Sequence, residues 1–336
     1  MKFSICMSAF NASNTIGYSI NSVLNQTFKD YELIVVDDGS TDTTFEIVNS
    51  FASQEPRIKL FSNGKLGLLK ARLLSIEMAT GEYVIFLDSD DLLKIDALEQ
   101  ISFCAEKHSS PDLIHYCAFV ENKNGKIKSF KRINQPIECD NKDISRHLFE
   151  SLLLTGKYTT LWNKAVKREC FALDYLKTID NIFIGEDNLL LLFAANNIHT
   201  YAFLNKYLYT YRANNGITKE FRKDCLRNLQ IRFEAGQNAL RIAKFNINSF
   251  ITQLETKQVI DVSKIIAYQP NKVIDKADYF AVLQCVYNDE SFWTRFYSNN
   301  NNIPFLYKLP LRMIKKKHFK LLLSYKNICS FLRGVR

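Results

Sequence analysis

The sequence predicts an α/β protein with a largely parallel sheet, followed by a region made only of helices. Short apolar runs alternate with segments of helical periodicity over the first hundred residues, and two of these runs end in aspartate clusters. From about residue 221 onward only helical periodicity remains. Alternation of strands and helices is typical of crossover units that build parallel sheets. We expect one domain over residues 1–218 and a helical region with a basic amphipathic tail over residues 219–336.

Four apolar runs near the start of the chain predict strands, which are Phe3–Ser8, Glu32–Val36, Ile58–Phe61 and Tyr83–Leu87. Between them, apolar residues recur every three or four positions, the spacing of one helix face. The helices expected from this spacing are Asn14–Phe28, a segment around Phe45–Phe51, and a segment from Leu66 to Ile76. Later in the chain, Leu113–Val120 and Lys126–Phe130 flank Asn124-Gly125, a pair typical of a hairpin turn. Helical and short extended segments are expected from there to Arg212.

Composition argues against a disordered, collagen-like or coiled-coil protein, and the sequence offers neither a membrane span nor a secretion signal. The chain has 336 residues, of which 47% are hydrophobic and 24% charged, as in ordinary soluble globular domains. Its longest apolar run, Leu189–Ala195, is far shorter than the roughly 18 residues that a bilayer span needs. No secretion signal is visible, and the eight cysteines form no Cys-x-x-Cys pair. We therefore expect reduced thiols and a cytoplasmic protein.

Positive charge is concentrated at the C-terminal end. Ten Lys and Arg residues and no Asp or Glu lie between Ser291 and Arg336, so the net charge of +9 becomes −1 for residues 1–290. Apolar residues are interspersed with nine of these basic residues from Phe305 onward. Such a segment can lie in an anionic membrane interface. A solvated basic face on a soluble helix pair and a nucleic-acid contact are the alternatives.

Two of the predicted strands end in carboxylates. Asp37-Asp38-Gly39-Ser40 follows the second strand, and Asp88-Ser89-Asp90-Asp91 follows the fourth. Ligands of open α/β sheets bind at the carboxyl ends of the strands, so both clusters are expected at one edge of the sheet. Carboxylates there can hold Mg²⁺ or Mn²⁺ against phosphate oxygens, or accept hydrogen bonds from a ribose or a base. For either cluster alone, turns and helix caps are the favoured explanation, but the two together favour a nucleotide–metal site.

Five motifs occur in order over the first hundred residues: Ser8-Ala9-Phe10-Asn11, Leu24-Asn25-Gln26-Thr27-Phe28, Val35–Asp42, Gly67–Arg72 and Phe86–Asp91. Together they resemble the start of family-2 glycosyltransferases. A weaker likeness continues to about residue 218 through Trp162-Asn163-Lys164, Gly185-Glu186-Asp187 and Tyr209-Thr210-Tyr211-Arg212. The set is similar to bacterial lipooligosaccharide β-1,3-galactosyltransferases.

The resemblance implies a GT-A fold, in which residues 1–100 form the nucleotide-binding half and residues 101–218 the acceptor half. It implies inverting transfer of a hexose, with galactose as the first choice, from a UDP-sugar to a lipooligosaccharide or other surface glycan. Glucose or N-acetylhexosamine transfer in capsule or glycan assembly is the alternative. It also implies a divalent metal, Mn²⁺ or Mg²⁺. Because such acceptors are lipid-linked, it favours peripheral contact with the inner face of the cytoplasmic membrane over nucleic acid. The oligomeric state stays open.

The resemblance also assigns roles to residues of the donor site. Ser8 and Phe10 would line the uridine pocket, with Phe10 at a position where tyrosine is usual. Asp38 would accept a hydrogen bond from the uracil N–H, and Arg72 would approach the donor from its helix. Asp88 would bind the ribose side, while Asp90, with Asp91, would coordinate the metal.

On the acceptor side, the inverting reaction needs a base opposite the leaving diphosphate. The resemblance places Asp187 there, with Glu186 orienting the acceptor, although carboxylates at a helix start are also simple caps. Trp162 would form an acceptor wall or, equally, part of the core.

Two other classes of function remain open at this point. A phosphohydrolase with Asp88 as its nucleophile also places Asp-x-Asp after a strand, and a nucleotide-sugar-binding module would carry a catalytically inactive site.

Overall fold

The computed structural model describes residues 1–62, 64–122, 125–129, 135–137, 143–180, 182, 185–212, 225–243, 248–268 and 276–334. The chain divides into two compact units, Met1–Asn214 and Asn215–Arg336. The boundary expected after residue 218 lies in residues 213–224, outside the described residues.

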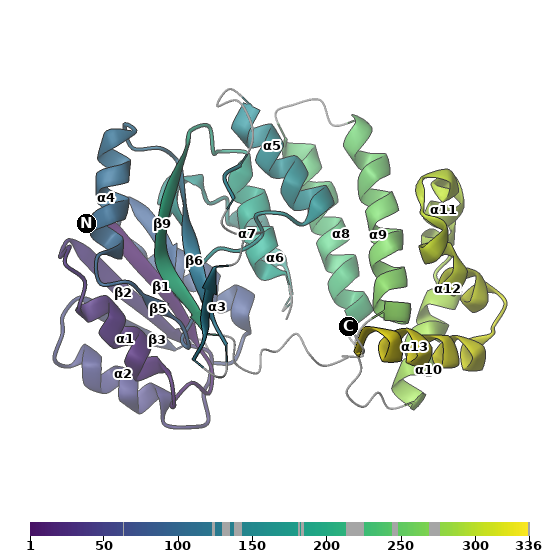
Figure 1. Ribbon diagram of the computed structural model, residues 1–336, viewed down its shortest axis with the longest axis horizontal. Helices are drawn as coiled ribbons and strands as arrows, with labels where there is room; N and C mark the ends of the chain where they lie inside the picture. The colour runs from purple at the N-terminus through teal and green to yellow at the C-terminus, as the bar shows by residue number, and fades with distance from the viewer. Residues whose placement is uncertain are drawn as a thin grey trace. The chain divides into compact units, whose positions relative to one another are not determined.

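The first unit is built on one mixed nine-stranded sheet with the order β3-β2-β1-β4-β8-β6-β9-β5, in which β7 pairs with β6. Figure 1 draws the strands of this sheet in purple to teal. The strands are β1 (Phe3–Ala9), β2 (Tyr31–Asp37), β3 (Ile58–Ser62), β4 (Tyr83–Phe86), β5 (Leu92–Leu93), β6 (Leu113–Glu121), β7 (Ile127–Ser129), β8 (Lys164–Lys167) and β9 (Tyr201–Arg212). Strands β1 to β4 run parallel, and β8 pairs antiparallel with both β4 and β6. The fold is therefore a parallel half joined to a mixed half.

Helices cover both faces of the sheet. The helices of this unit are α1 (Ile16–Leu24), α2 (Thr44–Ala52), α3 (Leu68–Met78), α4 (Ala97–Lys107), α5 (Ile144–Glu150), α6 (Asp174–Thr178) and α7 (Glu186–Ala195). Alternate side chains of a strand point to opposite faces. Odd-numbered residues of β1, such as Ile5, share a buried cluster with Ile20 of α1 and Ile101 of α4. Cys6 faces the other way, hydrogen-bonds Ser75 of α3 and is fully buried.

The structure confirms the predicted α/β class, the four N-terminal strands and the pairing of β6 with β7 as a hairpin. Residues 123–124 of the predicted turn lie outside the described residues. The helix expected over Asn14–Phe28 is shorter, because α1 spans only Ile16–Leu24. Strand β9 is a single twelve-residue strand where only short extended segments were expected. Its exposed middle, at Asn205 and Lys206, breaks the apolar run, and the β6–β9 register shifts near Cys117.

A buried carboxylate on β2 ties the start of the sheet together. Glu32 is fully buried and accepts hydrogen bonds from Ser4 Oγ at 2.6 Å, Lys59 Nζ at 2.6 Å, and the amide and hydroxyl of Thr80 at 2.7 and 2.8 Å. Burial alone would raise the pKa of Glu32, but the hydrogen bonds from Lys59, Ser4 and Thr80 outweigh it and lower the pKa to about 2. A carboxyl with a lowered folded-state pKa contributes stability above its ordinary value of 4.5, and that stability is lost as the pH falls toward 2.

We therefore expect Glu32→Gln to have a lower free energy of unfolding than the wild type at pH 7. The difference between the two proteins should be about 2 kcal/mol smaller at pH 3. Urea unfolding at the two pH values measures this, and Glu46→Gln, an exposed glutamate on α2, is the control. A gap that stays constant between pH 7 and pH 3 contradicts the prediction.

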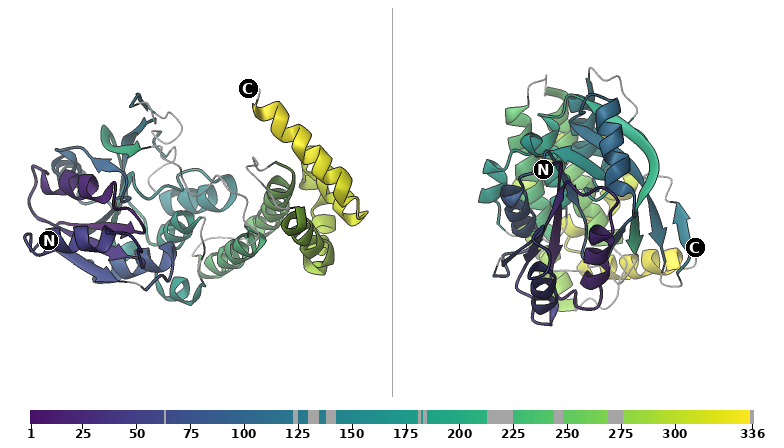
Figure 2. Two further views of the ribbon diagram at one scale, coloured as in Figure 1. Left: turned by 90° about the horizontal axis from the view of Figure 1, so that it is seen from below. Right: turned by 90° about the vertical axis from the view of Figure 1, so that its left-hand side faces the viewer.

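The second unit contains helices and no strand among its described residues. They are α8 (Cys225–Ile242), α9 (Asn248–Tyr268), α10 (Lys276–Asn288), α11 (Glu290–Ser298), α12 (Phe305–Lys315) and α13 (Phe319–Gly334), coloured green to yellow in Figures 1 and 2. Their buried side chains form a separate core that includes Ile266, Tyr279 and Trp293. No described helix is long and apolar enough to cross a bilayer.

Candidate active site

The carboxyl ends of β1, β2 and β4 lie side by side, as the strand pairing requires. Ala9 is paired with Asp37, and Cys6 with Phe86. The Asp38 amide donates to the Ala9 carbonyl at 2.8 Å, and its side chain accepts from the Gly67 amide at 2.8 Å. Asp38 thus ties the end of β2 to the start of α3. The predicted convergence of the two acidic clusters at one edge of the sheet is present.

A glycine makes the turn after Asp38 possible. Gly39 has φ of +76°, and a Cβ there would lie 2.9 Å from Lys65. A side chain at this position would meet both backbone strain and a steric clash.

Beside this turn lie the two residues expected to contact uridine. The Ser8 hydroxyl oxygen is buried and has no hydrogen-bond partner among the described residues. The Phe10 ring is 46% exposed, and Lys65 Nζ lies 5.4 Å from its centre. An exposed aromatic face can stack on a planar base, and a buried hydroxyl without a partner can bond a ligand. Both features suit the predicted pocket, although Asp38 already accepts one protein hydrogen bond.

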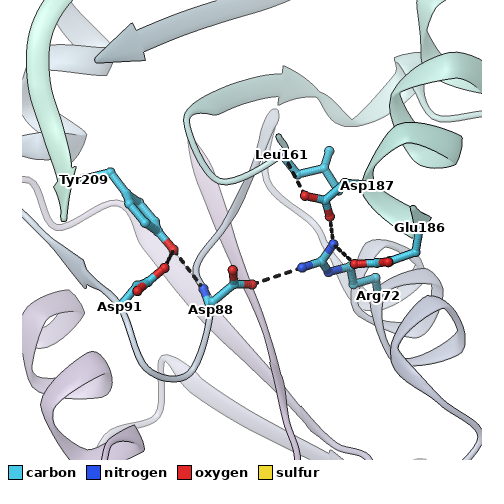
Figure 3. Close-up of polar contacts among 7 residues, drawn as sticks. All are labelled: Arg72, Asp88, Asp91, Leu161, Glu186, Asp187 and Tyr209. Carbon is cyan, nitrogen blue, oxygen red and sulfur yellow. Dashed lines mark hydrogen bonds and ion pairs between the residues drawn. The ribbon is translucent and has the colours of Figure 1, made fainter. Parts of the chain in front are cut away.

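Arg72 connects the two halves of the site, as Figure 3 shows. Its guanidinium, on α3, is only 6% exposed. One terminal nitrogen lies 3.0 Å from Asp88 Oδ1, after β4, while the other lies 3.1 Å from Glu186 Oε1 and also forms an ion pair with Asp187. Three carboxylates that are distant in sequence therefore share one buried cation. A planar guanidinium with several donors suits such bridging better than an ammonium.

Glu186 and Asp187 open helix α7, where the resemblance placed the acidic pair. Gly185 precedes them with φ of +95°, which turns the chain into the helix. The helix N-terminus stabilises both negative charges. Asp187 Oδ2 accepts from the Leu161 amide at 3.3 Å, and its Oδ1 faces Arg72 (Figure 3). Asp187 is thereby held from both sides.

Asp91 has a different environment from the other acids. It is fully buried, and its two oxygens accept from the Tyr209 hydroxyl at 2.7 Å and the Arg212 amide at 2.7 Å. Burial, followed by the nearby Asp88 charge, raises the pKa of Asp91 to about 8. This geometry argues against the prediction that Asp91 coordinates a metal. It instead anchors β9 to the loop that carries Asp88 and Asp90.

Tyr209 is a site residue to which the sequence argument gave no role. Besides donating to Asp91, its hydroxyl accepts from the Asp88 amide at 3.2 Å. In the sequence, Tyr209 stood out only as part of the Tyr209–Arg212 motif. That motif supported the family resemblance but assigned no role to the tyrosine.

Trp162 packs in the core. It is 8% exposed and stacks on Tyr209 and Tyr211, with ring centres 4.9 and 5.8 Å away. This packing favours the core alternative and argues against an acceptor wall at Trp162.

Of the two predicted metal ligands, Asp90 therefore remains as a candidate. Asp88, which was expected at the ribose side, precedes it in the same loop, and both are partly exposed. Among the residues that the structure describes, no three His, Cys, Asp or Glu side chains are grouped as a metal site.

Comparison with known proteins bears on the family of this chain. Residues 4–169 match the family model "Glycosyl transferase family 2". Residues 4–169 therefore match a family-2 glycosyltransferase domain, as the motifs predicted, and this match disfavours the phosphohydrolase alternative.

Three similar proteins are informative. A cholesterol galactosyltransferase of Borreliella burgdorferi is 30% identical over 221 residues, which is 62% of this chain and 59% of that protein. The structure of S. aureus TarS residues 1–349 with UDP-GlcNAc has a TM-score of 0.65 at 17% identity, covering 100% of this chain and 93% of that one. A mannosyltransferase from Pyrobaculum calidifontis, bound to GDP-Man and Mn²⁺, has a TM-score of 0.50 at 14% identity, covering 98% and 87%. The structural likeness confirms the fold alone.

Proposed function

We propose that this chain is an inverting glycosyltransferase that moves a hexose from a UDP-sugar to a hydroxyl of a lipid-linked or oligosaccharide glycan. The observation that carries the proposal is the bridge through Arg72. It joins Asp88, at the strand ends where nucleotides bind in such sheets, to the acidic pair that opens α7. Asp187, a carboxylate able to accept a proton, is thus separated from Asp88 only by the side chain of Arg72.

In the reaction, the acceptor oxygen attacks the anomeric carbon while the bond from that carbon to the UDP oxygen breaks, and UDP leaves with the electron pair. Asp187 takes the proton of the acceptor hydroxyl. The Leu161 amide and Arg72 hold Asp187 in one orientation, so the carboxylate is aligned before the acceptor arrives. Glu186 accepts a hydrogen bond from Arg72 and would orient the acceptor.

Uridine would bind between Phe10 and Ser8, with Asp38 accepting from the uracil N–H. The exposed ring, the buried hydroxyl and the position of Asp38 support this arrangement.

Asp90 would hold a Mg²⁺ or Mn²⁺ ion, which when bound would draw charge from the leaving diphosphate. Because Asp91 is turned into the core, we assign its place beside the metal to Asp88 instead of the ribose contact. These metals are usually bound by one or two carboxylates together with substrate phosphates and water, so two aspartates fit such a site. The Mn²⁺ in the mannosyltransferase supports this choice.

We place galactose first among the donor sugars and a lipid-linked glycan first among the acceptors. The cholesterol galactosyltransferase supports galactose as the sugar and a lipid as part of the acceptor, while the UDP-GlcNAc complex of TarS keeps N-acetylhexosamine as an alternative, beside glucose.

Contact with an anionic membrane, on its cytoplasmic side, is the further part of the proposal. Phe305, Leu306 and Leu309 of α12 are 69%, 53% and 37% exposed, and Leu321 of α13 is 59% exposed. Exposed basic residues flank them at Arg312, Lys315, Lys316, Lys317 and Lys320. Apolar side chains beside cations suit a surface of anionic lipids.

We expect the full chain to sediment with vesicles of anionic phospholipid and not with neutral ones. Replacing both Leu306 and Leu309 with serine should weaken binding about tenfold or more, because each leucine loses apolar burial in the lipid. Phe103→Ser is the matched control, since Phe103 is 65% exposed on α4. Equal sedimentation of the double variant and the control contradicts membrane contact through α12.

The experiment that tests the proposed function is a screen of UDP-sugars with Mn²⁺, scored by UDP release with and without glycan acceptors. We expect release with at least one hexose donor, and its loss in Asp90→Ala. UDP binding without turnover of any donor would support the inactive binding module instead. A trapped phosphoenzyme would support the phosphohydrolase.

A further inference from the structure

The loop over residues 160–163, just before β8, has all four of its backbone carbonyls bound from inside the fold. The Thr160 carbonyl accepts from Lys164 Nζ at 2.5 Å, and the Leu161 carbonyl from the Lys164 amide at 3.0 Å. The Trp162 carbonyl accepts from the Tyr116 hydroxyl at 2.9 Å, and the Asn163 carbonyl from the Tyr116 amide at 3.0 Å. Two residues, Lys164 and Tyr116, therefore supply the donors for all four carbonyls of the loop.

Lys164 is an unusual residue for this task. Its side chain is fully buried, which is rare for lysine, and its ammonium also donates to Asn163 Oδ1 at 2.9 Å. Asn163 Nδ2 in turn lies 2.9 Å from His115 Nε2, so the ammonium belongs to a polar network inside the sheet. Burial lowers the pKa of Lys164 to about 7. An apolar side chain would avoid this desolvation, so stability alone does not explain a lysine here.

The side of the loop away from the carbonyls faces the candidate base. The Leu161 amide donates to Asp187 Oδ2 at 3.3 Å, while Arg72 holds the other oxygen (Figure 3). The orientation of Asp187 thus depends on where the loop places one N–H group. A carboxylate shifted by about 1 Å can lose roughly a hundredfold in rate.

We propose that Lys164 is a positioning residue for sugar transfer: its buried ammonium fixes loop 160–163 so that the Leu161 amide holds Asp187 toward the acceptor. The proposal rests on the proposed function, because it gives Asp187 the role of base. Lys164 itself touches neither substrate nor metal in this scheme.

Two variants release the loop in different ways. Lys164→Met removes the ammonium and keeps an unbranched side chain, and Tyr116→Phe removes the bond to the Trp162 carbonyl. The matched control is Tyr83→Phe, because the buried Tyr83 hydroxyl also donates to a loop carbonyl, that of Pro111, at 2.7 Å. Within the part of the chain that the structure describes, Leu161 and Arg72 hold Asp187 and the Pro111 loop does not, so the control measures the cost of losing one buried tyrosine bond.

The measurements are kcat and KM for the donor, UDP affinity by calorimetry, and amide hydrogen exchange of Leu161. We expect kcat to fall about 10- to 100-fold in both loop variants, with UDP affinity within about twofold of the wild type. Exchange at Leu161 should be faster in both. In Tyr83→Phe, kcat and Leu161 exchange should match the wild type.

Equal kcat in the loop variants and in Tyr83→Phe would overturn the proposal, as would UDP affinity falling in parallel with kcat. If the wild type turns over no UDP-sugar, the proposed function fails on its own. Unchanged exchange at Leu161 in Lys164→Met then refutes the loop mechanism independently.

Discussion

Asp187→Asn should lower the rate of sugar transfer by about 10²–10⁴-fold, the range that a positioned general base contributes. Asparagine keeps the shape and can still accept from the Leu161 amide at the position of Oδ2, but it cannot take the acceptor proton. UDP affinity should be retained, because Asp187 is assigned to the acceptor hydroxyl and not to the nucleotide. Steady-state turnover together with UDP titration measures both effects.

Two further variants make this result specific. Asp174→Asn removes an exposed carboxylate in the first turn of α6 and should leave turnover unchanged. Glu186→Gln should raise KM for the acceptor more than it lowers kcat, as expected for a residue that orients the acceptor. If Glu186→Gln loses turnover while Asp187→Asn keeps it, the two roles are exchanged and Glu186 is the base.

The strand ends of the first unit could be predicted from the sequence because parallel strands that are buried on both faces consist of nearly continuous apolar residues. Phe3–Ser8 and Tyr83–Leu87 are such runs, and the pairing of β1 with β2 and β4 then brings Asp38 and Asp88 to one edge. Strand β9 was not predicted as one strand, because its polar middle hides a pairing with β6 that only the folded sheet creates.

Within the candidate site, the spacing of three neighbouring aspartates in the sequence could not predict which of them is buried. Asp88, Asp90 and Asp91 all follow one strand, but only Asp91 points into the core, where β9 returns with Tyr209 and Arg212. The partners of Asp91 are about 120 residues away, so its burial is a tertiary property. The same holds for Trp162, whose stack with Tyr209 and Tyr211 depends on β9. Arg72 was expected near the donor, but its contact with the α7 acids required the fold.

Arg72→Met should have the second large effect, and it should act on stability and turnover together. The substitution leaves Asp88, Glu186 and Asp187 near one another without the cation that pairs with all three. Removing one partner of a buried ion pair costs about 3–5 kcal/mol, because the remaining charges stay desolvated. Turnover should fall as well, since Asp187 loses its ion pair with Arg72 and keeps only the hydrogen bond from the Leu161 amide. Denaturant unfolding at pH 7 and steady-state kinetics measure the two losses.

Arg72→Lys separates charge from geometry. Lysine keeps the positive charge, but its single ammonium cannot span Asp88 and the α7 acids as the planar guanidinium does. We expect most of the stability to return in Arg72→Lys while turnover stays at least about tenfold below the wild type, because alignment of Asp187 requires the bridge.

The matched control for Arg72→Met is Arg57→Met. It breaks the bidentate pair of Arg57 with Glu55, whose two hydrogen bonds are 2.9 and 2.7 Å long and whose side chains are partly exposed. Loss of such a pair should cost at most about 1 kcal/mol and leave turnover intact. If Arg72→Met behaves like Arg57→Met in both assays, the bridge has no part in holding the two halves of the site together, and the case for Asp187 as an aligned base is lost with it.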